Sequence, residues 1–242
     1  MPTVRLLHVS DTHLRSGVGG TSDYHPGVDP AARLDIVLEA VARAGEPADV
    51  AVHSGDITDD FSLAAASAVR DRLASAAATV IAVPGNHDDP AVVATAFGPA
   101  HAEVHGWRIL GVDSTVRDEV AGSVVAAEVA AMLDAREPVP TVLVMHHPPR
   151  SRSTHPWFVL DGADALLDAL AARPHVRALL TGHTHAAYDE ALPGGLRLLG
   201  APSTYYALAH DGPAMSLPES GYGARIVELH EDGSVTTSVV EA

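Results

Sequence analysis

The 242-residue sequence contains no cysteine and no lysine. Without cysteine the chain can build no disulfide framework, no thiolate zinc site and no cysteine nucleophile, and this absence fits a reducing compartment. Without lysine, all fifteen basic residues are arginine. This excludes Schiff-base and pyridoxal-phosphate chemistry, together with the lysine-bearing phosphate loop of nucleoside triphosphatases.

Positive charge is scarce overall, because the formal net charge is −16 with histidine neutral. Such an acidic surface disfavours broad contact with nucleic-acid backbones and anionic membranes, so we expect neither a long nucleic acid nor a membrane as a partner. No segment reaches the roughly 18 consecutive apolar residues of a transmembrane helix. The first apolar run, Val4–Val9, is too short for a signal peptide and is followed by Asp11. These features predict a cytoplasmic protein.

The composition is otherwise that of an ordinary globular protein. The hydrophobic fraction is 47% and the charged fraction 19%, which excludes an intrinsically disordered chain. A chain of 242 residues is long enough to bury a full hydrophobic core. Because no repeat, low-complexity tract or long linker divides the sequence, we predict a single domain over residues 1–242.

Short apolar runs alternate with helical patterns along most of the chain. The runs typical of buried strands are Val4–Val9, Val50–His53, Thr79–Val83, Ile109–Val112, Val142–Met145 and Val176–Leu180. The helical patterns are Pro30–Ala44, Ser62–Ala77, Val124–Arg136 and Asp161–Ala172. This alternation predicts an α/β architecture in which helices cover a mostly parallel sheet.

The last quarter of the chain has a different pattern. Leu196–Leu199, Ala224–Leu229 and Val235–Val240 resemble strands, and Glu231–Gly233 carries a hairpin signal. We therefore expect the chain to close with antiparallel strands, which gives two packed sheets rather than one open sheet.

Five short blocks of acidic, amide and imidazole side chains each follow an apolar run. In chain order they are Asp11-Thr12-His13, Gly55-Asp56, Gly85-Asn86-His87-Asp88, His146-His147-Pro148-Pro149 and Gly182-His183-Thr184-His185. Ligands of α/β sheets bind beyond the carboxyl ends of the strands, so these blocks should meet at one edge. Oxygen and nitrogen donors without sulfur suit two divalent metals about 3.5–4 Å apart, which can clamp a phosphoryl group. The glycines that precede Asp56, Asn86 and His183 let the backbone turn sharply and approach an ion closely.

With the motifs D-x-H, G-D-x-x-D, G-N-H-D, H-H-P-P and G-H-x-H, the sequence resembles the calcineurin-like metallophosphoesterase superfamily. The forms V-S-D-T-H-L, G-N-H-D-D and M-H-H-P-P are most similar to its bacterial branch of cyclic-nucleotide (class III) and glycerophosphodiester phosphodiesterases. The likeness extends from about Leu6 to Thr204. It implies a β-sandwich of two mixed sheets flanked by helices, in agreement with the strand pattern.

The resemblance also implies a role for each residue of the blocks. One metal would be held by Asp11, His13, Asp56 and His185, and the other by Asp56, Asn86, His146 and His183, with Asp56 bridging. A metal-bound hydroxide would attack phosphorus in line. His87 would stabilise the phosphoryl oxygens or protonate the leaving alkoxide, and Asn86 would also contact the phosphate. His147 and Asp59 would support the site without binding metal.

These roles describe a dinuclear-metal phosphodiesterase that acts on small diesters such as 3′,5′-cyclic nucleotides or glycerophosphodiesters. An alternative is a phosphomonoesterase or nucleotide pyrophosphatase with the same metal site. A non-catalytic scaffold of this fold should have lost His87 or several ligands, and this sequence keeps them all. The two divalent metals would be Mn²⁺, Fe²⁺ or Fe³⁺, or Zn²⁺, which make the site positive inside a negative protein. A homodimer is compatible with the resemblance.

Several residues outside these roles leave alternatives open. His53 could orient the Asp56 loop or simply pack, and His147 could be structural or support the site. His155 and His210 could contact the substrate. Tyr205 and Tyr206 could stack a base or a neighbouring subunit, or fill the core. Substrate identity should depend on three loops: Arg15–Asp29, Arg150–Leu160 and Tyr205–Gly221. Motifs alone do not interpret these loops.

Overall fold

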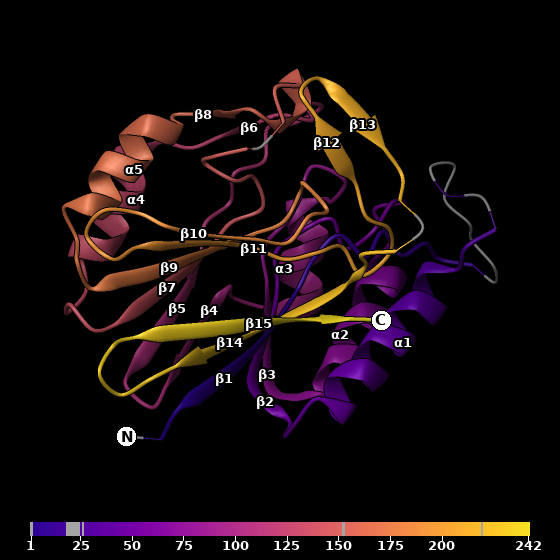
Figure 1. Cartoon of the computed structure of the whole chain (residues 1–242), viewed down its shortest axis with the longest axis horizontal. Helices are drawn as coiled ribbons and strands as arrows, with labels where there is room; N and C mark the ends of the chain where they lie inside the picture. Colours follow the sequence, from indigo (N-terminus) through magenta and orange to yellow (C-terminus); the bar gives the residue numbers. More distant parts are fainter. Residues whose placement is uncertain (1, 18–24, 26, 152, 219) are drawn as a thin grey trace.

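Two β-sheets packed face to face form the centre of the structure, and helices cover both outer faces (Figure 1). The computed structural model describes residues 2–17, 25, 27–151, 153–218 and 220–242. Much of the Arg15–Asp29 loop, which we expect to influence substrate choice, therefore lies outside the described residues.

The first sheet has a parallel centre, as the alternation of strands and helices predicts. Its strands lie in the order β15 (Val235–Glu241), β14 (Gly223–Leu229), β1 (Val4–Val9), β2 (Ala48–His53) and β3 (Ala77–Ala82). β1, β2 and β3 are parallel, whereas β14 is antiparallel to β1 and β15 is antiparallel to β14. The β14–β15 hairpin turns through Gly233, where φ is 79°. The hairpin predicted at Glu231–Gly233 is thus confirmed.

The second sheet is also mixed. Its strands lie in the order β10 (Tyr188–Ala191), β11 (Arg197–Gly200), β9 (Val176–Thr181), β7 (Thr141–Val144), β5 (Trp107–Gly111) and β4 (His101–Val104). The four central strands are parallel, and the two edge strands are antiparallel to their neighbours. Each sheet therefore has a group of parallel strands whose carboxyl ends can present side chains to a shared site.

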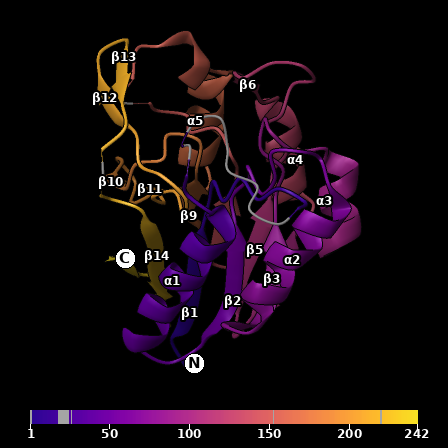
Figure 2. The ribbon, with the colours of Figure 1, turned by 90° about the vertical axis from the view of Figure 1, so that its right-hand side faces the viewer.

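Helices form an outer layer on each sheet (Figures 1 and 2). They are α1 (Pro30–Arg43), α2 (Leu63–Ala74) and α3 (Pro90–Phe97) beside the first sheet, and α4 (Ala126–Asp134) and α5 (Ala163–Ala171) beside the second. Leu34 and Leu73 join the helices to the first sheet, and Leu133 and Leu170 join them to the second. The predicted sandwich of two mixed sheets between helices is confirmed.

Strand β1 shows how the pleat builds these layers. Leu6 faces the apolar core between the sheets, whereas Leu7 and Val9 face the helices. Successive side chains of a strand point to opposite faces, so a strand buried on both faces reads as a continuous apolar run. His8 shares the face of Leu6, and its Nε2 lies 2.9 Å from Oγ of Ser54. A polar layer therefore begins inside the sandwich, directly below the strand ends.

The structure contains elements that the sequence patterns do not predict. They are α3, the edge strands β4 and β10, and a hairpin of β12 (Ala209–Asp211) and β13 (Ala214–Ser216) within the segment expected to be a loop. Edge strands of three or four residues are too short to show a clear period. Helix α3 does carry readable signals, because Asp89 caps the N–H of Ala91 at 2.8 Å and Pro90 occupies the first turn.

The second predicted helix, Ser62–Ala77, is too long at both ends. Ser62 is the N-cap, whose hydroxyl accepts the N–H of Ala65, and the helix ends at Ala74. Ala77 already begins β3, where it pairs with Ala48. Alanine favours helices, but strand pairing decides the conformation here.

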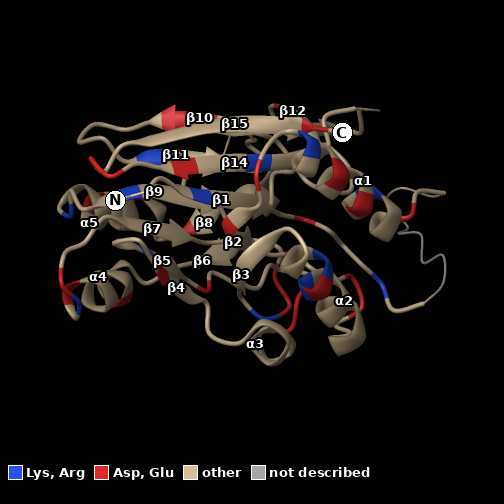
Figure 3. Cartoon of the chain, turned by 90° about the horizontal axis from the view of Figure 1, so that it is seen from below, with Lys and Arg blue, Asp and Glu red and all other residues tan. Residues whose placement is uncertain are grey.

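Charged side chains are dispersed along the ribbon. In Figure 3, α1 and α2 each carry both acidic and arginine positions, without a continuous basic stretch. Among the described residues, every helix is too short or too polar to span a bilayer.

Candidate metal centre

The five blocks meet at one edge of the sandwich, as their placement after strands predicts. Asp11, Asp56 and Asn86 follow β1, β2 and β3, and His146 and His183 follow β7 and β9. Backbone hydrogen bonds tie the loops together: the N–H of Asp11 donates to the carbonyl of Gly55, and the N–H of Gly182 to that of His146, both at 3.0 Å.

Five of the predicted ligands adopt left-handed backbone. The φ angles are 54° at Asp11, 51° at His13, 54° at Asp56, 67° at His183 and 50° at His185. This conformation costs a residue with a Cβ atom about 1–2 kcal/mol. Strain gathered at one edge indicates that the direction of these side chains, rather than local stability, decides the backbone.

The first predicted metal site is a close cluster of buried groups. Ligand atoms of Asp11, His13, Asp56 and His185 all lie within 4.8 Å of one another. The Nε2 atoms of His13 and His185 are 3.2 Å apart, and Nε2 of His185 is 3.2 Å from Oδ1 of Asp11. Two donors that each lie about 2.1 Å from one metal are separated by roughly 3–3.5 Å. The spacing therefore fits a shared ion.

Hydrogen bonds on the far side of each ring decide which nitrogen faces this cluster. Nδ1 of His13 donates to Oδ1 of Asp59 at 2.7 Å, and Nδ1 of His185 donates to the carbonyl of Tyr206 at 2.8 Å. In neutral rings the two Nε2 atoms then carry lone pairs that face each other, an arrangement that a cation stabilises. The donor set fits a divalent metal ion.

The second predicted site lies on the other side of Asp56. Nε2 of His146 is 3.2 Å from Oδ1 of Asn86 and 3.4 Å from Oδ1 of Asp56. Oδ2 of Asp56 faces the first site instead, 3.8 Å from Nε2 of His13. The two carboxylate oxygens thus face different groups, as a bridging ligand requires. His183 joins the second group, with its ring centroid 4.9 Å from that of His146.

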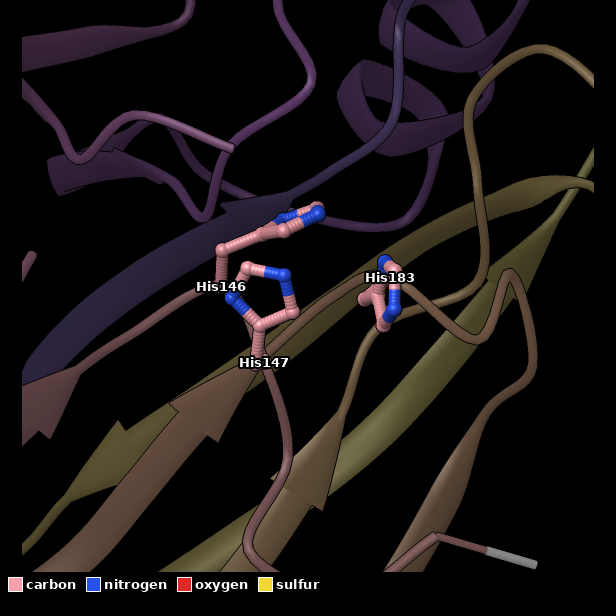
Figure 4. A group of neighbouring side chains, drawn as sticks. All are labelled: His146, His147 and His183. Atoms are coloured by element: carbon pink, nitrogen blue, oxygen red, sulfur yellow. The ribbon is translucent and has the colours of Figure 1, made fainter. Parts of the chain in front are cut away.

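His147 lies beside both of these rings (Figure 4), and its centroid is 4.5 Å from that of His183. Its Nε2 donates to the carbonyl of Val120 at 3.0 Å, and its Nδ1 accepts from the hydroxyl of Ser114 at 2.8 Å. Both nitrogens are occupied by protein groups, which supports the prediction that His147 is structural. His146 and His183 instead each donate from one ring nitrogen to a backbone carbonyl outside the cluster. Nδ1 of His146 donates to the carbonyl of Ser54 at 2.7 Å, and Nε2 of His183 donates to that of Trp157 at 2.8 Å.

The loops approach one another so closely that only glycine fits at the predicted positions. A Cβ on Gly55, where φ is 98°, would lie 2.6 Å from Nδ1 of His146. A Cβ on Gly85 would collide with the carboxylate of Asp56, and Gly182 is equally crowded. These glycines thus permit the loops to approach one another closely, and their approach to an ion stays a prediction.

The charges of the cluster favour an added cation. Burial raises the pKa of Asp56, but His146 and His87 outweigh burial and hold that pKa well below its usual range. Burial likewise raises the pKa of Asp11, and His185 outweighs it to leave the pKa lowered. Burial lowers the pKa of His146, yet Asp56 and Asp11 raise it to about 9. Protons and metal ions therefore compete for this site.

His87 shares a carboxylate with a predicted metal ligand. Its Nδ1 is 3.1 Å from Oδ1 of Asp59, the same atom that accepts from His13. Burial lowers the pKa of His87, but Asp56 and Asp59 outweigh this effect and raise the pKa to about 9. When no ion shares the charge of Asp56, the two carboxylates thus favour the protonated imidazole. Asp59 supports the site through hydrogen bonds, as the motif predicts.

Asp88 has a role that the sequence analysis misses. Its buried carboxylate accepts the backbone N–H groups of Gly85, Ile57 and Thr58 at 2.9–3.1 Å. These bonds fasten the loop of Asp56 to the loop that contains Asp88 itself. Burial and the charge of Asp56 nevertheless raise the pKa of Asp88 to about 6. The only sequence signal is an acid that directly follows a predicted catalytic histidine.

Two histidines whose roles were open hold the site in place. Nε2 of His53 lies 2.9 Å from Oγ1 of Thr12, and its Nδ1 accepts the N–H of Gly55 at 3.3 Å, so it links two of the loops. Nε2 of His210, on β12, donates to the carbonyl of Thr184 at 2.8 Å. Thr184 lies between two predicted ligands, so this hairpin positions the fifth block.

A cavity of about 940 Å³ opens onto the cluster. Its inner end is lined by His13, Asp56, Asn86, His87, His183 and His185. Tyr206 also lines it, whereas Tyr205 is fully buried and its hydroxyl donates to the carbonyl of His25 at 3.2 Å. His155 and His210 are not among the described residues that line the cavity. Tyr206 is thus placed for substrate contact, and Tyr205 is a core residue.

Comparison with known proteins agrees with this geometry. A model of the calcineurin-like phosphoesterase family matches residues 4–187. The 3′,5′-cyclic adenosine monophosphate phosphodiesterase CpdA of Pseudomonas aeruginosa is 31% identical over 247 residues, 98% of this chain and 89% of that protein. The protein of the same name from Escherichia coli is 33% identical over 248 residues, again 98% and 89%. A cAMP/cGMP dual specificity phosphodiesterase of Mycobacterium tuberculosis is 31% identical over 201 residues, 76% of this chain and 62% of that protein.

Solved structures share the fold at low sequence identity. A dimetal phosphatase from Danio rerio has a TM-score of 0.64 and 14% identity, with 99% of this chain and all of that chain covered. A purple acid phosphatase from yellow lupin has a TM-score of 0.62 and 10% identity, with 99% and 52% covered. At such identities the likeness concerns the fold alone.

Proposed function

The chain belongs to the calcineurin-like phosphoesterase family, and from this membership we propose that it hydrolyses 3′,5′-cyclic nucleotides at a centre of two divalent metal ions. In this reaction water adds to phosphorus and the bond to the 3′-oxygen breaks, so that the product is a nucleoside 5′-monophosphate. Relatives that align with 98% of the chain are named as cyclic AMP phosphodiesterases, which supports a diester substrate.

One observation carries the proposal: two groups of donor atoms share a single buried carboxylate. Oδ2 of Asp56 faces Nε2 of His13 at 3.8 Å, and its Oδ1 faces Nε2 of His146 at 3.4 Å. In each group, an outward hydrogen bond from the histidine fixes the nitrogen that faces inward. A pair of cations bridged by a carboxylate matches this arrangement.

We assign the first ion to Asp11, His13, Asp56 and His185, and the second to Asp56, Asn86, His146 and His183. Divalent ions at these positions would neutralise phosphoryl charge and lower the pKa of water. Carboxylate, amide and imidazole donors without thiolate suit Mn²⁺, Fe²⁺ or Fe³⁺, and Zn²⁺. Because the chain has no cysteine and none of the assigned ligands carries sulfur, we do not expect a preference for soft metals.

His87 is the general acid of the proposed reaction. The nearby carboxylates of Asp56 and Asp59 favour the protonated ring, which is the form that a general acid requires. Asp59 accepts the hydrogen bond of Nδ1, which orients the ring over the cavity. That proton passes to the departing 3′-oxygen as its bond to phosphorus breaks, and Asn86, in the same cavity, holds the phosphate.

The charge of the outer cavity favours a diester over the alternative substrates. Beyond the metal centre, the described lining includes the acids Asp89, Asp118 and Glu119 and a single arginine, Arg117. A phosphomonoester or a pyrophosphate carries at least one more negative charge than a cyclic diester, and these acids would repel it. The phosphomonoesterase and nucleotide pyrophosphatase alternatives therefore receive less support.

The cavity volume of about 940 Å³ is that of a small-molecule site rather than a nucleic-acid track. Together with the net charge of −16, it supports a small substrate and no long nucleic acid. A cytoplasmic location and a homodimer stay predictions.

Rates on three substrates test the proposal. With Mn²⁺ added, we expect the protein to hydrolyse cyclic AMP and bis(p-nitrophenyl) phosphate faster than the monoester p-nitrophenyl phosphate. Failure of the metal-loaded protein to hydrolyse either diester contradicts the proposal. A monoester rate above both diester rates favours the phosphomonoesterase alternative.

A further inference from the structure

The cavity has an outer half that the metal centre does not explain. Its lining includes Phe61, Val116, Trp157 and Leu217, four of the eight large apolar side chains that are most exposed in the described chain. Single exposed apolar residues are ordinary, but four that line one cavity indicate contact with an apolar part of a ligand. A phosphate alone has no such part.

Trp157 is the largest of these four side chains and the one tied most directly to the centre. It lies in the short 3₁₀ helix Pro156–Phe158. Its carbonyl accepts the hydrogen bond of Nε2 of His183 at 2.8 Å, and its own N–H donates to Nδ1 of His155 at 3.2 Å. Its backbone position is therefore fixed relative to a predicted metal ligand, and so relative to the phosphate.

The neighbouring aromatic residue has the opposite environment. Phe158 is buried, with its ring 5.0 Å from that of His183 and 4.8 Å from that of His210. The indole of Trp157 is 48% exposed and meets the ring of His155 edge to face at 4.8 Å. Phe158 anchors the turn, while Trp157 is exposed and lines the cavity.

We propose that Trp157 is the platform on which the nucleobase stacks, and that the enzyme therefore selects diesters with a planar ring over ringless glycerophosphodiesters. This inference rests on the proposed function, which it narrows to one of two diester classes. Tryptophan loses little conformational freedom on binding, and stacking accepts any base because every base has a π-face. Phe61, also at the rim and 58% exposed, adds apolar surface to the same half.

The energy of base stacking decides the size of the expected effect. Removal of a stacking aromatic weakens binding by about 10-fold to 100-fold per base. The loss should affect ligands that contain a base and spare those that contain only sugar and phosphate. A role for Trp157 through His183 and the metal centre would instead weaken both kinds of ligand alike.

Two product-like ligands separate these outcomes, because 5′-AMP and ribose 5-phosphate differ only in the base. Their dissociation constants should be measured on Mn²⁺-loaded wild type, Trp157→Ala, Trp157→Phe and Val159→Ala. Val159 is a matched control, since its side chain is exposed two residues away but does not line the cavity. Metal content of every variant should be measured alongside.

We expect Trp157→Ala to weaken the binding of 5′-AMP about 10-fold or more, while the affinity for ribose 5-phosphate stays unchanged. Trp157→Phe should restore much of the preference for 5′-AMP, and Val159→Ala should match wild type. Unchanged 5′-AMP binding in Trp157→Ala overturns the inference. Equal weakening of both ligands, or loss of metal, overturns it as well.

Fluorescence provides a direct second readout, because the chain has two tryptophans. Trp107 is buried, and its indole N–H donates to the carbonyl of His230 at 3.3 Å, far from the cavity lining. Addition of 5′-AMP should change the emission of wild type but not of Trp157→Phe. An equal change in both proteins contradicts stacking on Trp157.

Failure of this inference is distinct from failure of the proposed function. If the wild type hydrolyses cyclic AMP but binds 5′-AMP and ribose 5-phosphate equally well, the proposed function stands and the stacking role of Trp157 is wrong. If 5′-AMP stacks on Trp157 but the wild type does not hydrolyse cyclic AMP, the stacking role of Trp157 stands and the proposed function is wrong.

Discussion

The inner and outer halves of the cavity are built on different principles. In the inner half, side chains from five strand ends converge, and Asp11, Asp56 and His185 accept a left-handed backbone to do so. Outward hydrogen bonds orient the rings of His13, His146, His183 and His185 there. In the outer half, Phe61 and Trp157 come from loops and are about half exposed.

This difference separates the reaction from the substrate. Directed donors at fixed spacing determine what happens at phosphorus, so a change there should affect every substrate alike. Apolar surface at the rim contacts only the remainder of the substrate, so a change there should affect some substrates and not others. Variants in the two halves test this contrast.

The largest expected effect is that of Asp56→Ala. Because Asp56 is placed to bridge both ions, we expect this variant to lose both metals and to lose activity by about 10⁴-fold or more, equally on cyclic AMP and bis(p-nitrophenyl) phosphate. Metal analysis and kcat/KM on both substrates measure the two losses. Full activity with one metal per chain would show that the bridge is not required.

His87→Ala should give the next largest effect. This variant should keep its metals but lose about 10²- to 10⁴-fold in kcat, because no group then protonates the leaving oxygen. A substrate with a p-nitrophenolate leaving group needs less protonation, so its loss should be smaller than that on cyclic AMP. If the variant loses its metals, the role assigned to His87 is wrong.

Asp59→Asn should have a smaller effect of the same kind. Oδ1 of Asp59 contacts both His13 and His87, so the change weakens the support of one predicted ligand and of the general acid. We expect about a 10- to 100-fold loss of kcat/KM on both diesters. Asp60→Asn is the matched control, since that half-buried neighbour accepts hydrogen bonds from Ser16 and Ser62, does not line the cavity and should leave the rate unchanged. An equal loss in both variants would contradict a specific role.

The smallest expected effect concerns the polar layer below the inner half. Burial, followed by the charge of Arg225, lowers the pKa of His8 from 6.5 to about 3. The unfolded chain then binds a proton that the folded chain excludes, so this residue costs stability as the pH falls from 6.5 towards 3. The slope is about 1.4 kcal/mol per pH unit within that window.

His8→Gln should remove this part of the acid sensitivity while it keeps a donor for Ser54. Urea unfolding between neutral and mildly acidic pH, at matched metal content, measures the slope of the unfolding free energy. His101→Gln, at an exposed histidine of β4, is the control. A slope unchanged in His8→Gln would show that the buried ring does not oppose protonation.

Sequence predicts the inner half far better than the outer half. Each predicted ligand follows an apolar strand, and parallel strands end at the same edge of a sheet, which brings Asp11 near Asp56. The packing of the two sheets then brings His183 to Asp11. Gly55 is a readable signal of the close approach between loops, because the structure leaves no room for a Cβ atom at that position. The edge strands β4 and β10 escape prediction because a strand of four residues shows no clear period.

The outer half escapes prediction for another reason. Trp157 and Phe158 are adjacent aromatic residues after a proline, and nothing in the sequence says that one is buried and the other exposed. That outcome depends on contacts with His183 and His210, which are distant in sequence. The clamp formed by Asp88 is hidden in the same way, because its partners are backbone N–H groups rather than side chains.

The most direct test of the central claim is a titration of metal-free protein with Mn²⁺, followed by cyclic AMP hydrolysis and bound metal per chain. The two donor groups joined by Asp56 predict that activity rises with loading and reaches its maximum at two ions per chain. A protein that binds two ions and does not hydrolyse cyclic AMP, or that is fully active at one, would contradict the account.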